Sequence, residues 1–222
     1  MKELMITELY DLDHTLAAPY LEDFEYPWEA LAGLGEFIVA LGKRLSAEEY
    51  EEIGDQIWVA KSAVIAPTAS IKGPVIIGKE TEVRHGAFIR GNALVGDHAV
   101  VGNSTELKNV ILFDHVQVPH YNYVGDSILG YYSHMGAGSI TSNVKSDKKP
   151  VVIKAGETHL ETGRKKVGGM LGDFVEVGCG TVINPGSVIG RNTSIYPLSM
   201  IRGYIPANSV YKKLGEIATK EA

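Results

Sequence analysis

The sequence of 222 residues has very little cysteine and no long apolar stretch. Its one cysteine, Cys179, excludes an internal disulfide framework and a cysteine-rich zinc module. It contains no run of about 18 or more apolar residues, so no membrane-spanning helix is expected. The chain does not open with a basic flank followed by an apolar segment, so no signal peptide is predicted. We therefore expect a cytoplasmic protein with one main domain and an appendage.

A basic excess is also lacking. The chain holds 27 acidic and 21 basic residues, for a net charge of −6. Residues 1–56 carry 14 of the acids and only three of the bases, so the remaining residues are mildly basic. Much of that surplus lies between Lys145 and Lys166. This balance is too weak to predict a nucleic-acid partner, but it is compatible with small phosphate-bearing ligands. No membrane partner is expected.

Internal repetition is the strongest feature that is present. An aliphatic residue returns at every sixth position along Ile65, Ile71, Ile77, Val83, Ile89, Val95, Val101 and Leu107. The period then skips one residue twice, is interrupted after residue 143, and returns from Leu171 onward. Six is not a helical spacing. It is typical of a parallel β-helix in which each turn buries its aliphatic residues against the next turn. A β-sandwich fits this spacing much less well.

The repeat divides the chain into segments. Residues 1–56 are an acidic N-terminal extension with helical patterning, in which Pro27 suits a helix start and Ser46 a helix N-cap. We expect this extension to pack on the β-helix or on a neighbouring subunit. Residues 57–207 form the predicted β-helix domain, with an insertion at 144–170 that is long enough to contain a small hairpin. Residues 208–222 are predicted to be a short C-terminal helix that covers the last turn.

The spacing also predicts which side chains stack on one another. Turns of a parallel β-helix lie roughly 4.8 Å apart. Arg90 and Lys108 each follow an inward aliphatic residue, one turn apart, and would either bind a phosphate together or remain two solvated bases. Glu106 and Tyr123 form another such column, and His120 lies three residues before Tyr123. A carboxylate near a histidine suits a general base, although a surface hydrogen-bonded cluster is the alternative.

The stretch from Val101 to Asn143 resembles the acetyltransferase domain of the bifunctional enzyme that makes UDP-N-acetylglucosamine. The stretches "VPHYNYVGDSILG" and "LETGRKKVGGMLGD" resemble the C-terminal domain of sugar-1-phosphate nucleotidyltransferases. Both belong to the hexapeptide-repeat acyltransferase superfamily. The resemblance implies an all-β, left-handed parallel β-helix with three hexapeptides per turn. It also implies a homotrimer that binds a sugar phosphate and holds coenzyme A, as acetyl-CoA or another acyl-CoA, in the cleft between two subunits.

The resemblance implies roles for individual residues. His120 matches the catalytic histidine and Glu106 its acidic partner. Residues matching substrate ligands are Arg90, Lys108, Tyr123, His134, Asn143 and Lys149. The coenzyme is expected along Ala137, Cys179 and Pro197, and no metal is expected. The implied reaction is transfer of an acetyl group to the amine of an amino-sugar phosphate such as glucosamine-1-phosphate.

Three features keep alternatives open. His134 stands where the family has an asparagine, and Val144 replaces a tyrosine. Residues 151–169 have no counterpart in the bifunctional enzyme. These changes leave room for a sugar O-acetyltransferase, or for a non-catalytic module that only binds sugar phosphates. No glycine-rich nucleotide loop is found, so we do not expect nucleotidyltransferase activity from these residues.

Two weaker signals compete with this interpretation. "LYDLDHTLA", with Asp11 as the nucleophile, imitates a phosphatase loop, but the αβ alternation required by that fold does not follow it. His115 and His120 lie five residues apart and His85 shares a column with His120, which suggests a zinc site between subunits. Their different positions in the repeat do not favour the convergence that zinc requires.

Overall fold

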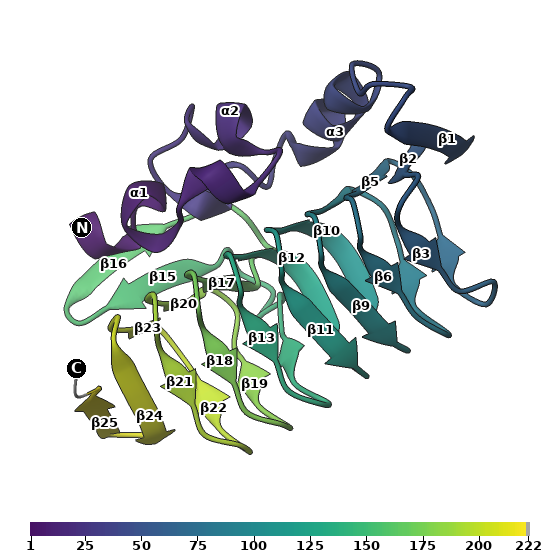
Figure 1. Ribbon diagram of the computed structural model, residues 1–222. Helices are drawn as coiled ribbons and strands as arrows, with labels where there is room; N and C mark the ends of the chain where they lie inside the picture. The colour runs from purple at the N-terminus through teal and green to yellow at the C-terminus, as the bar shows by residue number, and fades with distance from the viewer. Residues whose placement is uncertain (221–222) are drawn as a thin grey trace.

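The protein is a three-sided parallel β-helix with its N-terminal segment laid along one side (Figure 1). The computed structural model describes residues 1–220. Inward aliphatic residues pair from turn to turn, as Val83 with Val101 and Val101 with Val118. All three of these side chains are buried. The parallel β-helix predicted from the six-residue repeat is therefore confirmed.

The three sides of the β-helix, here called faces 1, 2 and 3, are built from short strands. Face 1 contains β2 (Ile57–Ala60), β5 (Val75–Ile77), β8 (Ala93–Val95), β17 (Gly169–Leu171), β20 (Ser187–Ile189) and β23 (Tyr204–Ile205). Face 2 contains β4 (Ser70–Ile71), β7 (Phe88–Ile89), β14 (Ile140–Thr141), β19 (Val182–Ile183) and β22 (Met200–Ile201). Face 3 contains β3 (Val64–Ile65), β6 (Glu82–Val83), β9 (Val100–Asn103), β11 (Gln117–His120), β13 (His134–Met135), β18 (Glu176–Val177), β21 (Ser194–Ile195) and β24 (Ser209–Lys213).

Two longer strands cross from face 2 to face 1. They are β10 (Glu106–Leu112) and β12 (Tyr123–Leu129), and they join both faces into one 14-stranded sheet. The start of β10 pairs with β7, whereas its end pairs with β8. The two places where the six-residue period is shortened by one residue lie within these two strands. They matter for function because they place a continuous row of side chains across one edge of the prism.

Buried threonines occupy positions two residues before the inward aliphatic residues, as Thr81 does before Val83 and Thr105 before Leu107. Thr81 Oγ1 donates to the Gly96 carbonyl at 2.7 Å, and Thr105 Oγ1 donates to the Val118 carbonyl at 2.9 Å. Neither threonine is accessible to solvent. A buried hydroxyl is costly unless it is hydrogen-bonded, so these bonds allow polar residues to occupy the core corners.

One corner of the prism is lined by stacked rings. His98, His115, Tyr132 and Phe174 occupy equivalent corner positions with φ of 54°, 60°, 55° and 58°. Left-handed backbone is disfavoured for bulky residues. Their ring centroids lie 4.7, 4.4 and 5.9 Å apart in nearly parallel pairs. Ring stacking contributes favourably and partly offsets the cost of the corner backbone.

The N-terminal segment packs on face 1 of its own chain, which answers the question left open by the sequence. Its elements are η1 (Lys2–Leu4), α1 (Ile6–Leu9), η2 (Leu12–His14), α2 (Ala18–Leu21), η3 (Pro27–Glu29) and α3 (Leu34–Gly42). Helix α3 contacts β5, β8 and β10. A Cβ on Gly42 would lie 2.2 Å from the Trp58 ring, so only glycine allows this approach. Pro27 begins η3 as predicted.

The helix predicted to begin at Ser46 is wrong. Residues after Ser46 form a turn and then β1 (Tyr50–Gly54), which pairs antiparallel with β2. Tyr50 is buried, whereas the next three residues are exposed. The acidic run suggested a helix, but the first turn of the β-helix has an open strand edge, and pairing with that edge gives β1 its hydrogen bonds.

The predicted C-terminal helix is also wrong as far as residue 220; residues 221–222 lie outside the described part of the chain. β24 continues face 3 by pairing Ile195 with Tyr211, and β25 (Glu216–Thr219) folds back on it as an antiparallel hairpin. Tyr211 is buried at the position that aliphatic residues fill in earlier turns. The hairpin, rather than a helix, covers the last turn.

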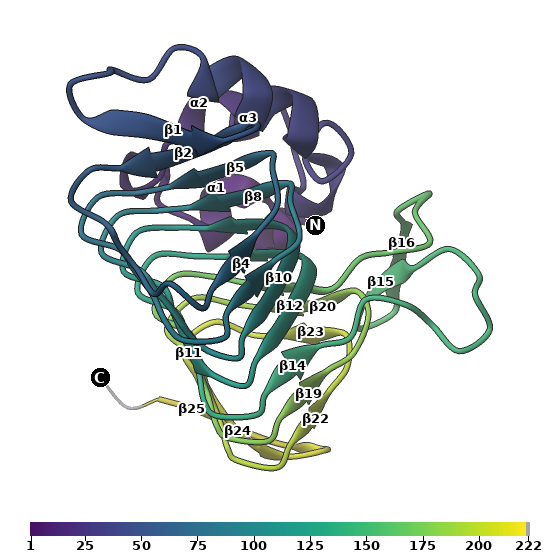
Figure 2. The same ribbon diagram turned by 90° about the vertical axis from the view of Figure 1, so that its right-hand side faces the viewer.

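The insertion at 144–170 contains the expected hairpin. Strands β15 (Val152–Ala155) and β16 (Thr158–Glu161) pair antiparallel, and the segment projects from the prism (Figure 2). Its base is anchored at both ends of the insertion. The Val167 amide donates to the Asn143 carbonyl and the Gly168 amide donates to the Asp126 carbonyl. The insertion therefore returns to the strand crossing at β12.

Asp173 connects the N-terminal segment to the solenoid. Its buried carboxylate accepts from the backbone amides of Asp11 at 2.8 Å and Tyr131 at 2.9 Å, and it pairs with Arg191 at 3.0 Å. Burial is the main influence on this group, and it raises the pKa of Asp173 above the ordinary 3.8.

This raised pKa predicts a pH dependence of stability. The folded state holds the Asp173 proton to higher pH than the unfolded state, so the free energy of unfolding should fall as pH rises just above 3.8. Asp173→Asn should remove that fall, as measured by urea unfolding across pH. Asp147→Asn is the control of opposite sign, because a hydrogen bond from the Lys149 amide lowers the pKa of Asp147. A profile for Asp173→Asn that parallels the wild type would contradict the assignment.

Candidate active site

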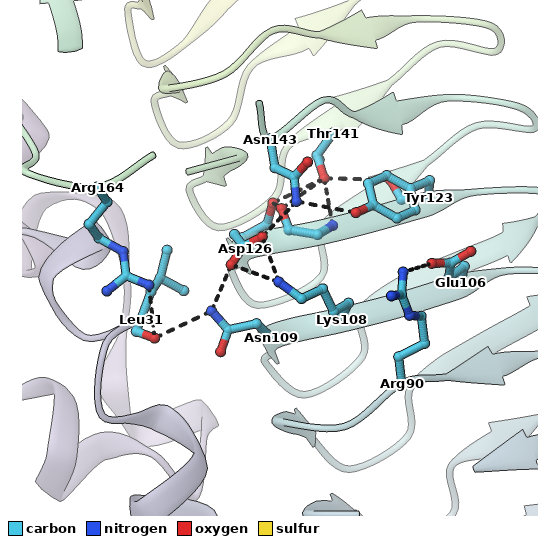
Figure 3. A network of polar contacts seen from close by, with 12 residues as sticks. Leu31, Arg90, Glu106, Lys108, Asn109, Tyr123, Asp126, Thr141, Asn143 and Arg164 are labelled. Carbon is cyan, nitrogen blue, oxygen red and sulfur yellow. Dashed lines mark hydrogen bonds and ion pairs between the residues drawn. The ribbon is translucent and has the colours of Figure 1, made fainter. Parts of the chain in front are cut away.

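The strand crossing brings the predicted phosphate ligands together. Glu106 pairs with Tyr123 across β10 and β12, and Lys108 pairs with Gly125. Arg90 follows β7, whose Ile89 pairs with Leu107. The register therefore places Arg90 one turn from Lys108, as the repeat predicted, and the two cations lie on one surface (Figure 3).

Glu106 lies against Arg90. Arg90 Nη1 donates to Glu106 Oε1 at 2.7 Å, and this bond raises the pKa of Arg90. The resemblance implies that Glu106 is the partner of His120, but no hydrogen bond or ion pair joins those two side chains among residues 1–220. Both members of the Arg90–Glu106 pair remain partly exposed, so the pair contributes little stability. The guanidinium is held in place and is still accessible to a ligand. The catalytic role of Glu106 stays a prediction.

Asp126 is the centre of the polar network, and the sequence analysis did not assign it. Its carboxylate accepts from Lys108 Nζ at 3.2 Å, from Asn109 Nδ2 at 2.9 Å and from Asn143 Nδ2 at 2.6 Å. The Asp126 side chain is only 3% exposed. It holds two neighbouring side chains of β10 and one side chain from after β14 in one arrangement. Asp126 was visible in the sequence as the aspartate of the stretch "VPHYNYVGDSILG", which carries the resemblance.

Tyr123 and Asn143 form the next part of the network. Asn143 Nδ2 donates to the Tyr123 hydroxyl at 3.2 Å, and it also bonds Asp126. Burial, the largest influence, raises the pKa of Tyr123, and the negative charges of Asp126 and Glu106 raise it further. The phenol therefore keeps its proton at neutral pH. Because its oxygen already accepts from Asn143, its O–H is free to donate to a bound anion.

His120 lies at the corner where face 3 meets face 2. Its backbone carbonyl accepts from the Gly138 amide, its own amide is held by Asn122 Oδ1, and the residue is exposed. Within residues 1–220 the imidazole makes no hydrogen bond to the protein. It is open to a ligand at the start of the row that continues through Tyr123.

The residues expected along the coenzyme form a single column that begins at His120. The Gly180 amide donates to the Ala137 carbonyl, and the Leu198 amide donates to the Cys179 carbonyl, each at 2.9 Å. The sites at Ala137, Cys179 and Pro197 are thus equivalent corner positions on successive turns, and all are exposed. From His120 the column extends over three turns, or roughly 14 Å.

His134 and Lys149 lie away from this network. His134 Nδ1 lies 2.9 Å from Glu176 Oε2 on face 3. Lys149 is exposed in the insertion, and its amide donates to Asp147. Val144, which stands where the family has a tyrosine, forms a backbone bridge with Lys166. The structure of this chain does not bring His134 or Lys149 into contact with Asp126 or Tyr123. Their substrate-binding roles stay predictions.

Two cavities lie near the crossing. The larger, of about 740 Å³, lies under the hairpin and is lined in part by Lys154, His159 and Arg202, and by none of the predicted site residues. The smaller, of about 450 Å³, is lined by Lys108 and Asp126 together with residues of the N-terminal segment and the insertion. The smaller cavity is therefore the one that belongs to the network.

No group of three or more His, Cys, Asp or Glu side chains suited to hold a metal ion occurs in the part of the chain that the structure describes. None of the helices within residues 1–220 is long and apolar enough to cross a bilayer.

Comparison with known proteins finds relatives in the families that the sequence resembles. The family model of the GMPPB C-terminal domain matches residues 71–157. The bifunctional protein GlmU of Methanococcus maripaludis is 34% identical over 205 residues, which cover 91% of this chain and 50% of that protein. The chain is homologous to the GlmU proteins over most of its length, in line with its hexapeptide-repeat β-helix.

Further relatives have partial coverage. The bifunctional sugar-1-phosphate nucleotidylyltransferase/acetyltransferase of Sulfurisphaera tokodaii is 28% identical over 67% of this chain and 41% of that protein. The chain spans about half the length of the GlmU proteins that it matches. Among solved structures, the polySia-specific acetyltransferase NeuO overlaps 75% of this chain and 88% of that chain, with 12% identity and a TM-score of 0.45. That overlap supports no conclusion about the function of this chain.

The hydrogen bonds that Asp126 accepts should stabilise the folded protein. Asp126→Asn keeps the side-chain shape but removes the charge that Lys108 faces, and one amide cannot accept from all three donors. The free energy of unfolding should fall by about 1–3 kcal/mol in urea titrations. The exposed Asp55→Asn is the control and should match the wild type. Equal stability of Asp126→Asn and Asp55→Asn would show that the network is not structural.

Proposed function

We propose that the protein transfers an acetyl group from acetyl-CoA to the amine of an amino-sugar phosphate. The observation that carries the proposal is the intersection at His120 of an exposed corner column and a row of phosphate-binding side chains. One relative is named a bifunctional sugar-1-phosphate nucleotidylyltransferase/acetyltransferase, which supports both the reaction and the substrate class.

The row on β10 and β12 suits the acceptor. A phosphate beside Arg90 and Lys108 would receive charge-assisted hydrogen bonds, since Arg offers a planar fork and Lys a point charge. The Tyr123 hydroxyl can donate to the same anion. Binding the phosphate there would direct the sugar amine toward His120, and such orientation supplies much of the rate of a two-substrate reaction.

The chemistry requires one proton acceptor. The amine nitrogen attacks the acetyl carbonyl carbon of the thioester, His120 takes the proton from that nitrogen, and the carbon–sulfur bond breaks as the thiolate leaves. The products are the N-acetylated sugar phosphate and free coenzyme A, whose sulfur regains a proton. The Gly136 and Gly138 amides already donate to the Val177 and His120 carbonyls, so the Ala137 amide between them is the donor in this turn for the developing oxyanion.

Removing the base tests the reaction. His120→Ala should lower kcat by about 10² to 10⁴ and leave the KM for glucosamine-1-phosphate nearly unchanged, with thiol release as the readout. His159→Ala, an exposed histidine on the hairpin, is the matched control and should keep full turnover. Undiminished turnover in His120→Ala would remove the base assignment. Binding of the sugar phosphate without thiol release in the wild type would favour a non-catalytic binding module.

A substitution in the corner column tests where the acetyl-CoA donor binds. Ala137 is exposed, so a larger side chain fits without repacking the core. Ala137→Phe should raise the KM for acetyl-CoA about tenfold or more by covering the column next to His120, with little effect on thermal unfolding. An unchanged KM for acetyl-CoA would place the coenzyme elsewhere.

A further inference from the structure

A second set of cationic side chains lies beyond Lys108, where face 2 turns into face 1. The smaller cavity, of about 450 Å³, is lined there by Arg164, Lys165 and Lys166 of the insertion and by Leu31 of the N-terminal segment. Lys108 lies on the solenoid wall of the same cavity. Three separate parts of the chain thus converge on one hollow (Figure 3).

The charges of this cavity are not balanced within it. Its lining holds four cationic side chains and one carboxylate, Asp126, which is already shared by Lys108 and two asparagines. Lys165 and Lys166 are exposed and form no ion pair with any residue from 1 to 220. Like charges gathered around a hollow repel one another unless an anion lies between them.

Arg164 adds an independent observation. Its Nη2 donates to the Leu31 carbonyl at 3.4 Å, while its buried Nε has no hydrogen-bond partner within the described residues. A buried donor that lacks a partner is costly. A guanidinium binds a phosphate oxygen through charge-assisted hydrogen bonds, and Arg164 Nη1, which makes no hydrogen bond within residues 1–220, is the nitrogen left for such a bond.

The position of this cavity indicates what kind of anion it takes. The row that begins at His120 reaches Tyr123 at the start of β12, and Asp126 lies three strand residues further, or about 10 Å. A sugar-1-phosphate whose amine lies at His120 brings its phosphate to Arg90, Tyr123 and Lys108. The cations of residues 164–166 lie past Lys108 and are left for a second phosphate.

We propose that Arg164, Lys165 and Lys166 form a subsite for the second phosphate of a diphosphate-linked amino sugar, so that the acceptor is a nucleoside diphosphate sugar. Lys108 lies between the two phosphates and contacts both. This inference rests on the proposed function for the direction of the sugar, but the presence of a diphosphate subsite is independent of acetyl transfer.

Direct binding tests the subsite without relying on the reaction. Inorganic pyrophosphate and inorganic phosphate, which carry no base or sugar, are titrated into the full chain by calorimetry at fixed ionic strength. The wild type should bind pyrophosphate about tenfold or more tightly than phosphate. The double variant Lys165→Ala/Lys166→Ala should lose that preference, and its unfolding should match the wild type because both side chains are exposed.

Lys154→Ala is the matched control, since Lys154 belongs to the same insertion but lines the other cavity. It should keep the pyrophosphate preference. Equal or undetectable binding of both anions by the wild type overturns the subsite, as does a preference that survives in the double variant or is lost equally in Lys154→Ala.

Thiol release with amino sugars linked to one or two phosphates separates this inference from the proposed function. Preferred turnover of the diphosphate-linked sugar supports the subsite, and preferred turnover of the monophosphate overturns it while leaving the acetyltransferase intact. No thiol release with either acceptor removes the proposed function, and the binding titrations then decide the subsite alone.

Discussion

The structure depends on the register of one turn of the β-helix against the next. Backbone amides of the β-helix strands donate to carbonyls one turn away, so a side chain's neighbours are set by the number of residues in each turn. Inward positions repeat as buried aliphatic residues and threonines, and outward positions repeat as columns. Two of these columns carry the proposed chemistry. One runs along the corner from His120, and the other crosses from Arg90 to Lys108.

Asp126 shows how a surface site is made rigid on such a scaffold. Its carboxylate is almost fully buried, yet it holds Lys108 and Asn109 of β10 together with Asn143, which follows β14. A buried charge requires compensation by donors, and these donors are the groups that face the proposed acceptor. Fixing them in advance reduces the entropy lost when a phosphate binds.

The N-terminal segment and the insertion are two additions to the regular β-helix. Both reach the same edge of the prism, where Arg164 donates to the Leu31 carbonyl. The contact lies beside the smaller cavity, to whose lining both the N-terminal segment and the insertion contribute. Additions to a regular scaffold thus shape the end of the row that lies farthest from His120.

The sequence by itself determined the β-helix and the stacking of Arg90 over Lys108, because a six-residue period fixes which residues are neighbours. The hairpin was predicted from the length of the insertion. The helices predicted at Ser46 and in the C-terminal segment are wrong, because acidic and mixed sequence patterns there resembled helical ones. Pairing with the open edges of the end turns outweighed those local preferences. Only the tertiary structure decided that Glu106 binds Arg90, that Asp126 centres the network, and that Arg164 joins it. These contacts join residues from 16 to 133 positions apart, and no local spacing encodes where a long side chain will find its partner.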